Sequence, residues 1–196
     1  LSNIIQTNFS QRLSYLISYP HGCIEQITSG GFPQLYISDF TKLTPEKTNE
    51  LKANVISVLD RYPTYQTSVG AMGYWPGNSS PHAWGTCYAT HFMLEAKKQG
   101  YTVPENILTP ALDWLVQSAK EWQFSNNNES TATQAYRLFV IALGGKADIS
   151  SMNRLYETRN LTDETLLLLS AAYSLAGRKD TAKELMNNGT TITIKE

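Results

Sequence analysis

The chain has 196 residues, is 41% hydrophobic and carries 16 basic against 17 acidic residues, a net charge of −1. This length supports a single domain over residues 1–196 with one core, and the balanced charge lacks the basic excess that nucleic-acid grooves and membrane surfaces require. No apolar run approaches the length of a bilayer span, so we expect no nucleic-acid partner and no direct membrane insertion.

Helical periodicity dominates the sequence. Apolar residues recur with helical spacing in nearly every segment and alternating strand patterns are almost absent, which predicts an all-α fold. The first helix carries its apolar residues between Ile4 and Ile17 and ends before Pro20, because the residue that precedes a proline is pushed out of the α region. A second helix begins at "GCIEQ", residues 22–26.

A clear helix start follows at Thr44, which can cap a helix that has Pro45 at its first position and Glu46 in its first turn. We expect this helix to run to about Tyr62, ahead of Pro63. The loop "TSVGAMGYWPGNSSP", residues 67–81, comes next. Its aromatic pair, Tyr74 and Trp75, suggests that the loop packs against another element. Later helices are expected over roughly residues 82–99, 105–121, 130–143, 149–158, 163–176 and 179–187, with a cap role for Ser130 or a neighbour in the polar run "NNNES".

Three of these helices end alike, in "QGYTVP", "LGGKAD" and "LAGRKD". Glycine at such a position supplies the left-handed conformation of a helix C-cap. The recurrence at Gly144 and Gly177 predicts an array of α-hairpins that bury their faces against one another. Such arrays either open into solenoids or close into rings. Only the last residues, "TTITIKE", alternate like a strand.

The segment "YPHGCIEQITSGGFPQLY", residues 19–36, places Cys23 and Gln26 three residues apart near a helix start. Residues at this spacing share one helix face, with β-carbons about 5–6 Å apart, so the thiol and the carboxamide would touch. A thiolate that attacks the carboxamide carbon and expels ammonia would leave an internal thioester. The unpaired N–H groups and the dipole of the first turn favour both the thiolate and an oxyanion. The alternative is a small core cysteine beside a surface glutamine.

Two stretches resemble the thioester-containing domain of the alpha-2-macroglobulin and complement family, in particular its bacterial branch. "GCIEQ" after "YP" and before "FPQLY" is similar to the thioester motif of that family. "GYWPGNSSPHAWGTCYATHFMLEAKKQGYTVP", residues 73–104, is similar to its aromatic loop and the long helix that follows. The resemblance implies an α/α toroid built from helical hairpins, incomplete in this chain, and a place within a longer multidomain protein.

The resemblance also implies a function, a covalent protease-trapping module that acts once as an endopeptidase inhibitor and is not an enzyme with turnover. In this family a protease cuts a bait segment elsewhere, a rearrangement exposes the thioester, and a nucleophile on the attacker is acylated. The partners would be attacking proteases or other amine-bearing targets and neighbouring domains of the same protein, in an extracytoplasmic location. The internal thioester would be a self-made modification, so no cofactor is implied.

Within the motif, the resemblance makes Cys23 the thiol partner, Gln26 the acyl donor and Glu25 an orienting residue. His21 stands where the bacterial pattern more often has tyrosine, and it would either act as a base beside the thiol or point to solvent. A thioester must be kept from water, and aromatic side chains are the obvious shield. The candidates are Tyr19, Tyr74, Trp75 and Trp84, and the alternative for each is ordinary packing within the hairpins.

A second departure from the family pattern bears on which nucleophile is preferred. Complement-type members that react with hydroxyls use a histidine well downstream of the thioester. The corresponding stretch here holds asparagines at residues 126–128 and no histidine. We therefore expect amines to be captured in preference to hydroxyls, because an amine is the stronger nucleophile and needs less general-base help.

Cys87 and His91 lie four residues apart on one predicted helix and could form a thiol–imidazole pair or half a metal site. No further ligands accompany them, which favours a core thiol near a packing histidine and no metal. His82 falls on a different face from His91. Two other functions stay open: a helical-repeat scaffold that binds proteins without covalent chemistry, and a cysteine hydrolase or transferase that uses Cys23 with His21.

Overall fold

The computed structural model describes residues 22–124, 128–158 and 160–189. Within these ranges every regular element is a helix, which confirms the all-α fold, and no helix there is long and apolar enough to cross a bilayer. The first predicted helix and the strand-like tail lie outside the described residues. The elements are α2 (Ile24–Gly31), η1 (Phe32–Leu35), α3 (Ile37–Phe40), α4 (Pro45–Tyr65), α5 (Ala83–Lys98), α6 (Glu105–Glu121), α7 (Asn128–Leu143), α8 (Ile149–Tyr156), α9 (Asp163–Leu175) and α10 (Lys179–Gly189).

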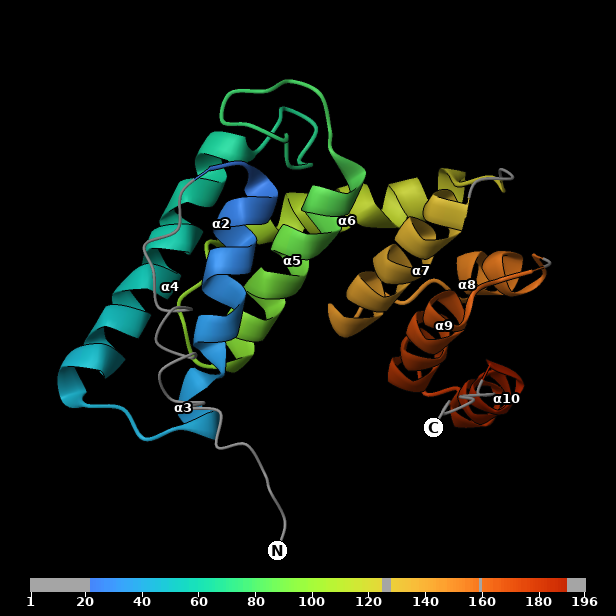
Figure 1. The fold of residues 1–196 in the computed structure, drawn as a ribbon. Helices are drawn as coiled ribbons and strands as arrows, with labels where there is room; N and C mark the ends of the chain where they lie inside the picture. Colours follow the sequence, from blue (N-terminus) through green and yellow to red (C-terminus); the bar gives the residue numbers. More distant parts are fainter. Residues whose placement is uncertain (1–21, 125–127, 159, 190–196) are drawn as a thin grey trace, which may run out of the picture.

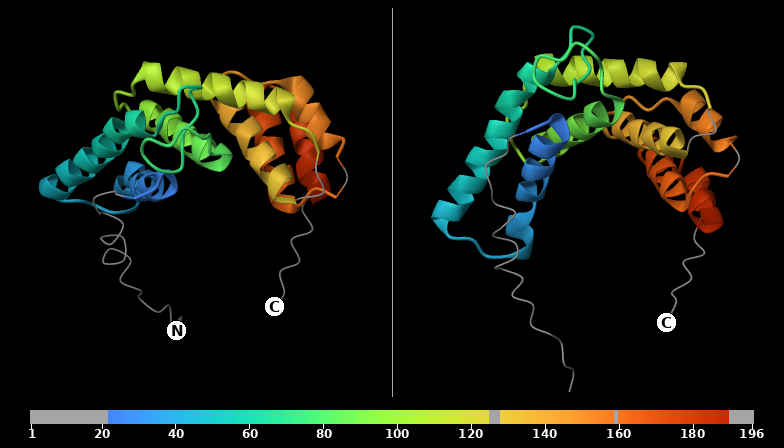
Figure 2. Two further views of the ribbon diagram at one scale, coloured as in Figure 1. Left: turned by 90° about the horizontal axis from the view of Figure 1, so that it is seen from above. Right: turned by 45° about the horizontal axis from the view of Figure 1, so that its top comes forward.

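The helices form an open arc of hairpins (Figures 1 and 2). Helices α2, α5, α7 and α9 follow one another along the inner side, each in contact with the next, while α4, α6, α8 and α10 lie outside them. This arrangement in two layers is that of an α/α toroid. Over the described residues the ring is incomplete, as predicted, because α2 and α4 at one end lie apart from α9 and α10 at the other.

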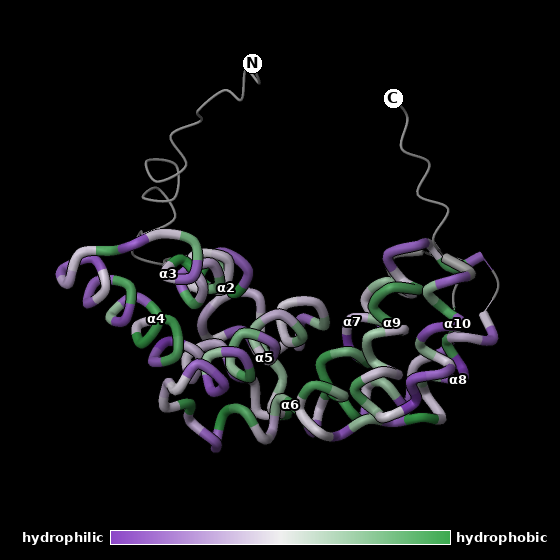
Figure 3. Tube along the Cα trace, turned by 90° about the horizontal axis from the view of Figure 1, so that it is seen from below, coloured by the Kyte–Doolittle hydropathy of each residue, from purple (hydrophilic) through white to green (hydrophobic). Residues whose placement is uncertain are grey.

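Two hydrophobic clusters run through the arc. One joins α2 and α4 to α5 and the first half of α6, and the other joins the rest of α6 to α7, α8, α9 and α10. In Figure 3 hydrophobic and hydrophilic turns alternate along α4, the pattern of a helix with one buried face. Helices α5 and α6 contribute to both clusters, so the two halves of the arc share one continuous packing.

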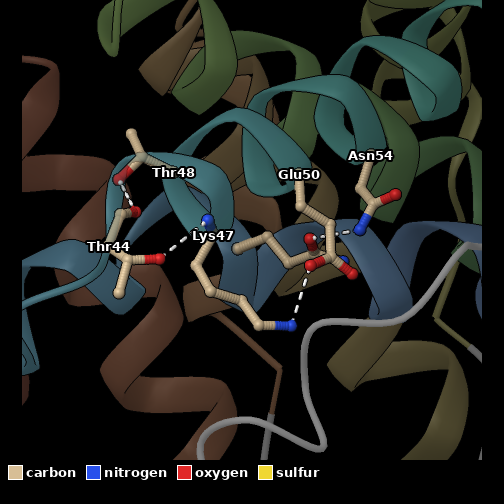
Figure 4. A network of polar contacts seen from close by, with 6 residues as sticks. Thr44, Lys47, Thr48, Glu50 and Asn54 are labelled. Atoms are coloured by element: carbon tan, nitrogen blue, oxygen red, sulfur yellow. Dashed lines mark hydrogen bonds and ion pairs between the residues drawn. The ribbon is translucent and has the colours of Figure 1, made fainter.

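Helix α4 begins where the sequence predicts but ends later. The Thr44 hydroxyl accepts a hydrogen bond from the Lys47 N–H at 3.3 Å, and the Lys47 ammonium pairs with Glu50 at 2.8 Å (Figure 4). The predicted end ahead of Pro63 is wrong, since α4 continues to Tyr65. A proline in the last turn removes only one helical hydrogen bond, and burial of the Tyr65 side chain directly behind it offsets that cost.

The remaining helices lie within a few residues of their predicted ranges. Helix α7 begins at Asn128, so Ser130 lies inside the helix, and the neighbours that precede α7, which the predicted cap role also included, lie outside the described residues. At the end of α7, Gly145 and not Gly144 has the left-handed conformation, with a φ of 73°. Gly144 is pressed against α6 instead, since a Cβ there would lie 2.7 Å from Leu112 Cδ2.

Helix α2 is fixed by its neighbours α4 and α5. A Cβ added at Gly31 would lie 2.8 Å from Val58 Cγ2 of α4, and one added at Gly85 of α5 would lie 2.6 Å from Ile24 Cγ2. Both glycines therefore allow the helices to approach closely. A helix of 8 residues is not stable by itself, so this packing sets the position and direction in which α2 begins.

Candidate functional site

The site lies at the first turn of α2. Cys23 is the N-cap residue and Gln26 occupies the N3 position, and together they form a capping box. The Cys23 backbone N–H donates to Oε1 of the Gln26 carboxamide at 2.9 Å. The structure brings the two residues together through this backbone-to-side-chain bond, and the contact of the thiol with the carboxamide that the spacing predicted stays a prediction. The carboxamide carbonyl is thereby held and polarised beside the thiol.

Gly22 makes room for the carboxamide. Its φ of 119° is a conformation that side-chain-bearing residues rarely adopt, and a Cβ at this position would lie 2.1 Å from Gln26 Oε1. The hydroxyl of Tyr65, at the end of α4, donates a hydrogen bond to the Gly22 carbonyl. The backbone before Cys23 is therefore anchored to α4 while its inner face is left free for Gln26.

The loop of residues 67–81 covers the same end of α2 (Figure 1). The Ile24 N–H, one of the unpaired donors of the first turn, donates to the Tyr74 carbonyl at 3.0 Å. The Cys23 side chain raises the pKa of the Tyr74 phenol above its usual value. The Tyr74 ring is held edge-on by Trp75 and His82, at centroid distances of 5.5 and 4.9 Å.

The two reacting groups differ in exposure. Cys23 is only 3% exposed, whereas Gln26 is exposed on the outer surface of the turn. Glu25 is half-buried, and its charge contributes to the raised pKa of the Tyr74 phenol. The sulfur is thus covered by protein while the carboxamide is open to an approaching molecule.

The predicted aromatic shield is correct in part. The Tyr74 carbonyl is bonded to the first turn of α2, but the Trp75 side chain next to it is 49% exposed. Trp84 points away from the motif and packs on Tyr136 of α7, with ring centroids 4.8 Å apart, so its assignment to the shield is wrong. Tyr19 and His21 lie outside the described residues.

Cys87 and His91 do not form a pair, because each has its own partners across the arc. Cys87 is fully buried beside Arg137 of α7, and burial raises the pKa of its thiol to about 12. His91 Nδ1 lies 2.9 Å from the Tyr136 hydroxyl, and burial lowers the pKa of the imidazole. The expectation of a core thiol near a packing histidine is confirmed, and His82 does lie elsewhere, at the N-cap of α5.

A cavity of about 610 Å³ with mainly apolar walls lies between η1 and the inner helices. Its walls are aromatic and aliphatic, and among the described residues no group of three or more histidine, cysteine or acidic side chains could hold a metal ion. The lining residues are Phe32, Pro33, Tyr36, Tyr88, His91, Tyr136, Phe139 and Leu168. This composition provides no acid–base or metal chemistry comparable to that at Cys23.

Sequence reasoning missed two residues that shape the site. Tyr65 lies far from the motif in the chain, and only the packing of α4 against α2 brings its hydroxyl to the Gly22 carbonyl. Gly22 itself was read as part of a motif, and its clash with Gln26 could not be foreseen without the backbone conformation. The signal for Tyr65 was its place in the apolar pattern of α4, which predicts burial but not a partner.

Comparison with known proteins gives the same family from sequence and from structure. Residues 1–139 match the family model "A-macroglobulin TED domain". Among curated relatives, alpha-2-macroglobulin of Xylella fastidiosa is 27% identical over 96% of this chain and 12% of its own length. Alpha-2-macroglobulin of Escherichia coli is 25% identical over 90% of this chain. The chain thus spans only about a tenth of these relatives, 12% and 11% of their lengths.

Solved structures agree with the fold. Salmonella alpha-2-macroglobulin reacted with methylamine superposes with a TM-score of 0.79 and 26% identity, covering 96% of this chain and 13% of that one. Trypsin-activated alpha-2-macroglobulin from Escherichia coli superposes with a TM-score of 0.73 and 25% identity, covering 87% of this chain and 13% of that one. Both likenesses extend over most of this chain.

Proposed function

This chain belongs to the A-macroglobulin TED domain family, and from that membership we propose that it is the covalent-capture module of a protease-trapping protein. In this proposal Cys23 and Gln26 condense to an internal thioester, which later acylates an amine on an attacking protease. The module reacts once and is then consumed, so it is an endopeptidase inhibitor and not an enzyme with turnover.

One observation carries the proposal, the 2.9 Å hydrogen bond from the Cys23 N–H to Gln26 Oε1. That oxygen gains negative charge whenever a nucleophile adds to the carboxamide or thioester carbon. A backbone N–H aimed at it, at the positive end of a helix, stabilises the charge without reorganisation. The same donor therefore favours both formation of the thioester and its later opening.

Formation would proceed by addition and elimination. The Cys23 sulfur bonds to the carboxamide carbon of Gln26, the C–N bond breaks, and the nitrogen leaves as ammonia after taking the thiol proton. Glu25 is placed on the same turn, half-buried, where it can orient the groups without bonding to the acyl carbon. The product holds an activated acyl group and needs no cofactor.

Opening would depend on access to the acyl carbon. Gln26 is exposed in this chain, so protection from water before activation would come from neighbouring domains of a longer protein. The relatives' structures support this sequence of events by analogy, since one was obtained after reaction with methylamine and another after activation with trypsin. We propose attacking proteases as partners and an extracytoplasmic location, where such proteases occur.

Intact-mass measurement of the native protein that carries this chain tests the proposal. We expect a mass one ammonia below that of the sequence, and incorporation of one methylamine on treatment. The matched control is Cys23→Ala, which should keep the full mass and the helical circular dichroism but incorporate no methylamine. An unmodified mass with no methylamine uptake in the wild-type protein would favour the helical-repeat scaffold instead.

The nucleophile preference is tested in the same assay. We propose that amines are captured far better than hydroxyls, because no histidine occurs near residues 126–128 to form an acyl-imidazole. Methylamine should therefore couple much faster than glycerol, and His21→Tyr should change this ratio little. Equal glycerol coupling that is lost in His21→Tyr would show that His21 relays the acyl group.

A further inference from the structure

Tyr65, the last residue of α4, is bonded to both segments that flank the reactive turn. Its hydroxyl donates a hydrogen bond to the carbonyl of Gly22, the residue directly before Cys23. Its own carbonyl accepts from the Gly73 N–H of the loop of residues 67–81 at 2.7 Å. The Tyr65 side chain is fully buried, so loss of its hydroxyl would leave the Gly22 carbonyl without a ready replacement from water.

These bonds belong to a closed chain of contacts around Cys23. The loop is also bonded to the first turn of α2, since the Tyr74 carbonyl accepts from the Ile24 N–H at 3.0 Å. The contacts thus run from Tyr65 through Gly22 to α2, across to the loop, and back to Tyr65. The backbone on either side of Cys23 is therefore held by two elements other than its own helix.

The Gly22 carbonyl and the Cys23 N–H belong to one peptide group. This N–H donates to Gln26 Oε1 at 2.9 Å, so the same planar unit accepts from Tyr65 at its oxygen and donates to the carboxamide at its nitrogen. The described peptide bonds are all trans, and the C=O and N–H of a trans peptide point in opposite directions. A bond that fixes the carbonyl therefore also fixes the direction in which the N–H points.

We propose that Tyr65 is a positioning residue of the capture reaction, which aims the Cys23 N–H at the acyl oxygen of Gln26 by holding the Gly22 carbonyl. This role rests on the proposed thioester and assigns to it a residue from outside the motif. The held peptide needs no reorientation as negative charge develops on the acyl oxygen. A hydroxyl that donates to a peptide carbonyl also polarises the whole group, which makes its N–H a stronger donor.

The role of Tyr65 follows from where charge develops when the thioester opens. The amine nitrogen adds to the acyl carbon derived from Gln26, and the carbonyl electron pair moves onto the oxygen that faces the Cys23 N–H. That pair returns as the C–S bond breaks, the sulfur takes the electrons of the broken bond, and the amine proton ends on the sulfur or in solvent. Tyr65 exchanges no proton and acts only through the peptide, so it lowers the barrier where the oxygen is most negative.

The test uses Tyr65→Phe in the native protein that carries this chain, with Tyr173→Phe as the matched control. Tyr173 of α9 is also buried and donates to Asn153 Oδ1 at 2.7 Å, but it lies in the other hydrophobic cluster. Methylamine incorporation is followed by mass, counting only molecules that already carry the thioester. We expect a rate about tenfold lower in Tyr65→Phe and unchanged in Tyr173→Phe. The fall is smaller than the roughly 100-fold loss on removing an oxyanion donor, because the Cys23 N–H remains.

A spectroscopic measurement separates this role from a general loss of stability. The stretching frequency of the thioester carbonyl reports the strength of the hydrogen bond to its oxygen. It is isolated by labelling glutamine with carbon-13 at the side-chain carbonyl and taking the infrared difference before and after methylamine. The band should move to higher wavenumber in Tyr65→Phe and stay in place in Tyr173→Phe. A substitution that lowers stability alone would leave the band where it is.

Circular dichroism and urea unfolding verify the fold of both variants. If Tyr65→Phe does not fold, Tyr65→3-fluorotyrosine keeps the hydroxyl and makes it a stronger donor, so the opening rate should rise and the band should move to lower wavenumber. A folded Tyr65→Phe protein that forms no thioester, while Tyr173→Phe forms one, also supports the role, because formation passes through the same oxyanion.

The contrary outcomes are distinct. An opening rate or a carbonyl band that the substitution of Tyr65 leaves unchanged, in a protein that carries the thioester, overturns the role of Tyr65 alone. A wild-type protein without a thioester overturns both this role and the proposed function.

Discussion

Replacing Gly22 with alanine should block thioester formation while leaving the fold standing. Gly22 precedes the reactive turn with a φ of 119°, and the space on its inner side is filled by the Gln26 carboxamide. An alanine methyl would lie 2.1 Å from Gln26 Oε1 and 2.8 Å from Cδ. These atoms form the far end of a flexible side chain, so the carboxamide will be displaced before the backbone is.

The Gly22→Ala substitution should have a small effect on stability and a larger effect on thioester formation. The left-handed conformation costs an L-residue on the order of 1–2 kcal/mol, which lowers the free energy of unfolding without abolishing folding. The displaced carboxamide loses the 2.9 Å hydrogen bond to the Cys23 N–H and moves by about 1 Å or more. A misplacement of that size can reduce a positioned reaction on the order of 100-fold. The chemical effect should therefore far exceed the effect on stability.

Gly100→Ala is the matched control, because Gly100 also has a positive φ, of 87°, but no atom lies within 4 Å of a Cβ there. Urea unfolding should show similar losses of stability for both variants. Intact mass should show the loss of ammonia in Gly100→Ala and the full sequence mass in Gly22→Ala. A normal thioester in Gly22→Ala, with normal methylamine uptake, would refute the claim that the room beside Gly22 positions Gln26.

Three further predictions concern residues of the framework. Cys87 is fully buried, and burial raises the pKa of its thiol to about 12. It should therefore resist iodoacetamide at pH 8 in the native protein and be alkylated only after unfolding. Alkylation of Cys87 in the native protein would contradict its place in the core. Burial lowers the pKa of His91, so at mildly acidic pH the unfolded chain binds a proton more readily than the folded chain, and the free energy of unfolding should fall as pH drops below about 6.5. The His91→Gln variant should therefore lose less stability than the wild type between pH 7 and pH 5. An identical loss in both proteins would exclude His91 as the cause. Gly31→Ala should destabilise by about 1–3 kcal/mol in urea unfolding, because its methyl would lie 2.8 Å from Val58 Cγ2, and an unchanged midpoint would mean that α4 yields freely.

Most of the fold could be predicted from local pattern because each helix buries one face and begins or ends at residues with strong backbone preferences. Thr44 before a proline and glycines after apolar runs mark such ends. The errors share one cause. Helix α4 passes Pro63 because burial of Tyr65 outweighs a lost hydrogen bond, and Gly144 is set by contact with α6 and not by capping. Tertiary packing decided these positions, and it leaves no local signal.

The candidate site, like the fold, could be predicted only in part from the sequence. The contact between Cys23 and Gln26 followed from spacing alone, because helix geometry fixes which residues share a face. The surroundings of Cys23 followed only in part: Tyr74 was an expected neighbour, whereas Tyr65 reaches the Gly22 carbonyl from α4. Trp84 was wrongly placed for a related reason: its neighbours in sequence lie near the motif, but its side chain leaves α5 toward α7.

The unequal burial of the two reacting residues bears on how a reactive bond could be stored and then used. Cys23 is only 3% exposed, and the loop of residues 67–81 is joined to the first turn of α2 by the bond from the Ile24 N–H to the Tyr74 carbonyl. The acyl side, at Gln26, faces outward, and nothing in the described part of the chain covers it. In the proposed mechanism the oxyanion donor, the Cys23 N–H at the start of α2, is in place whether or not a target is near. Timing must then come from whatever covers Gln26, because removing a cover exposes a group that already has its oxyanion donor in place. The proposed trap would need no change in the turn of Cys23 to become active, which agrees with the close packing of α2 between α4 and α5.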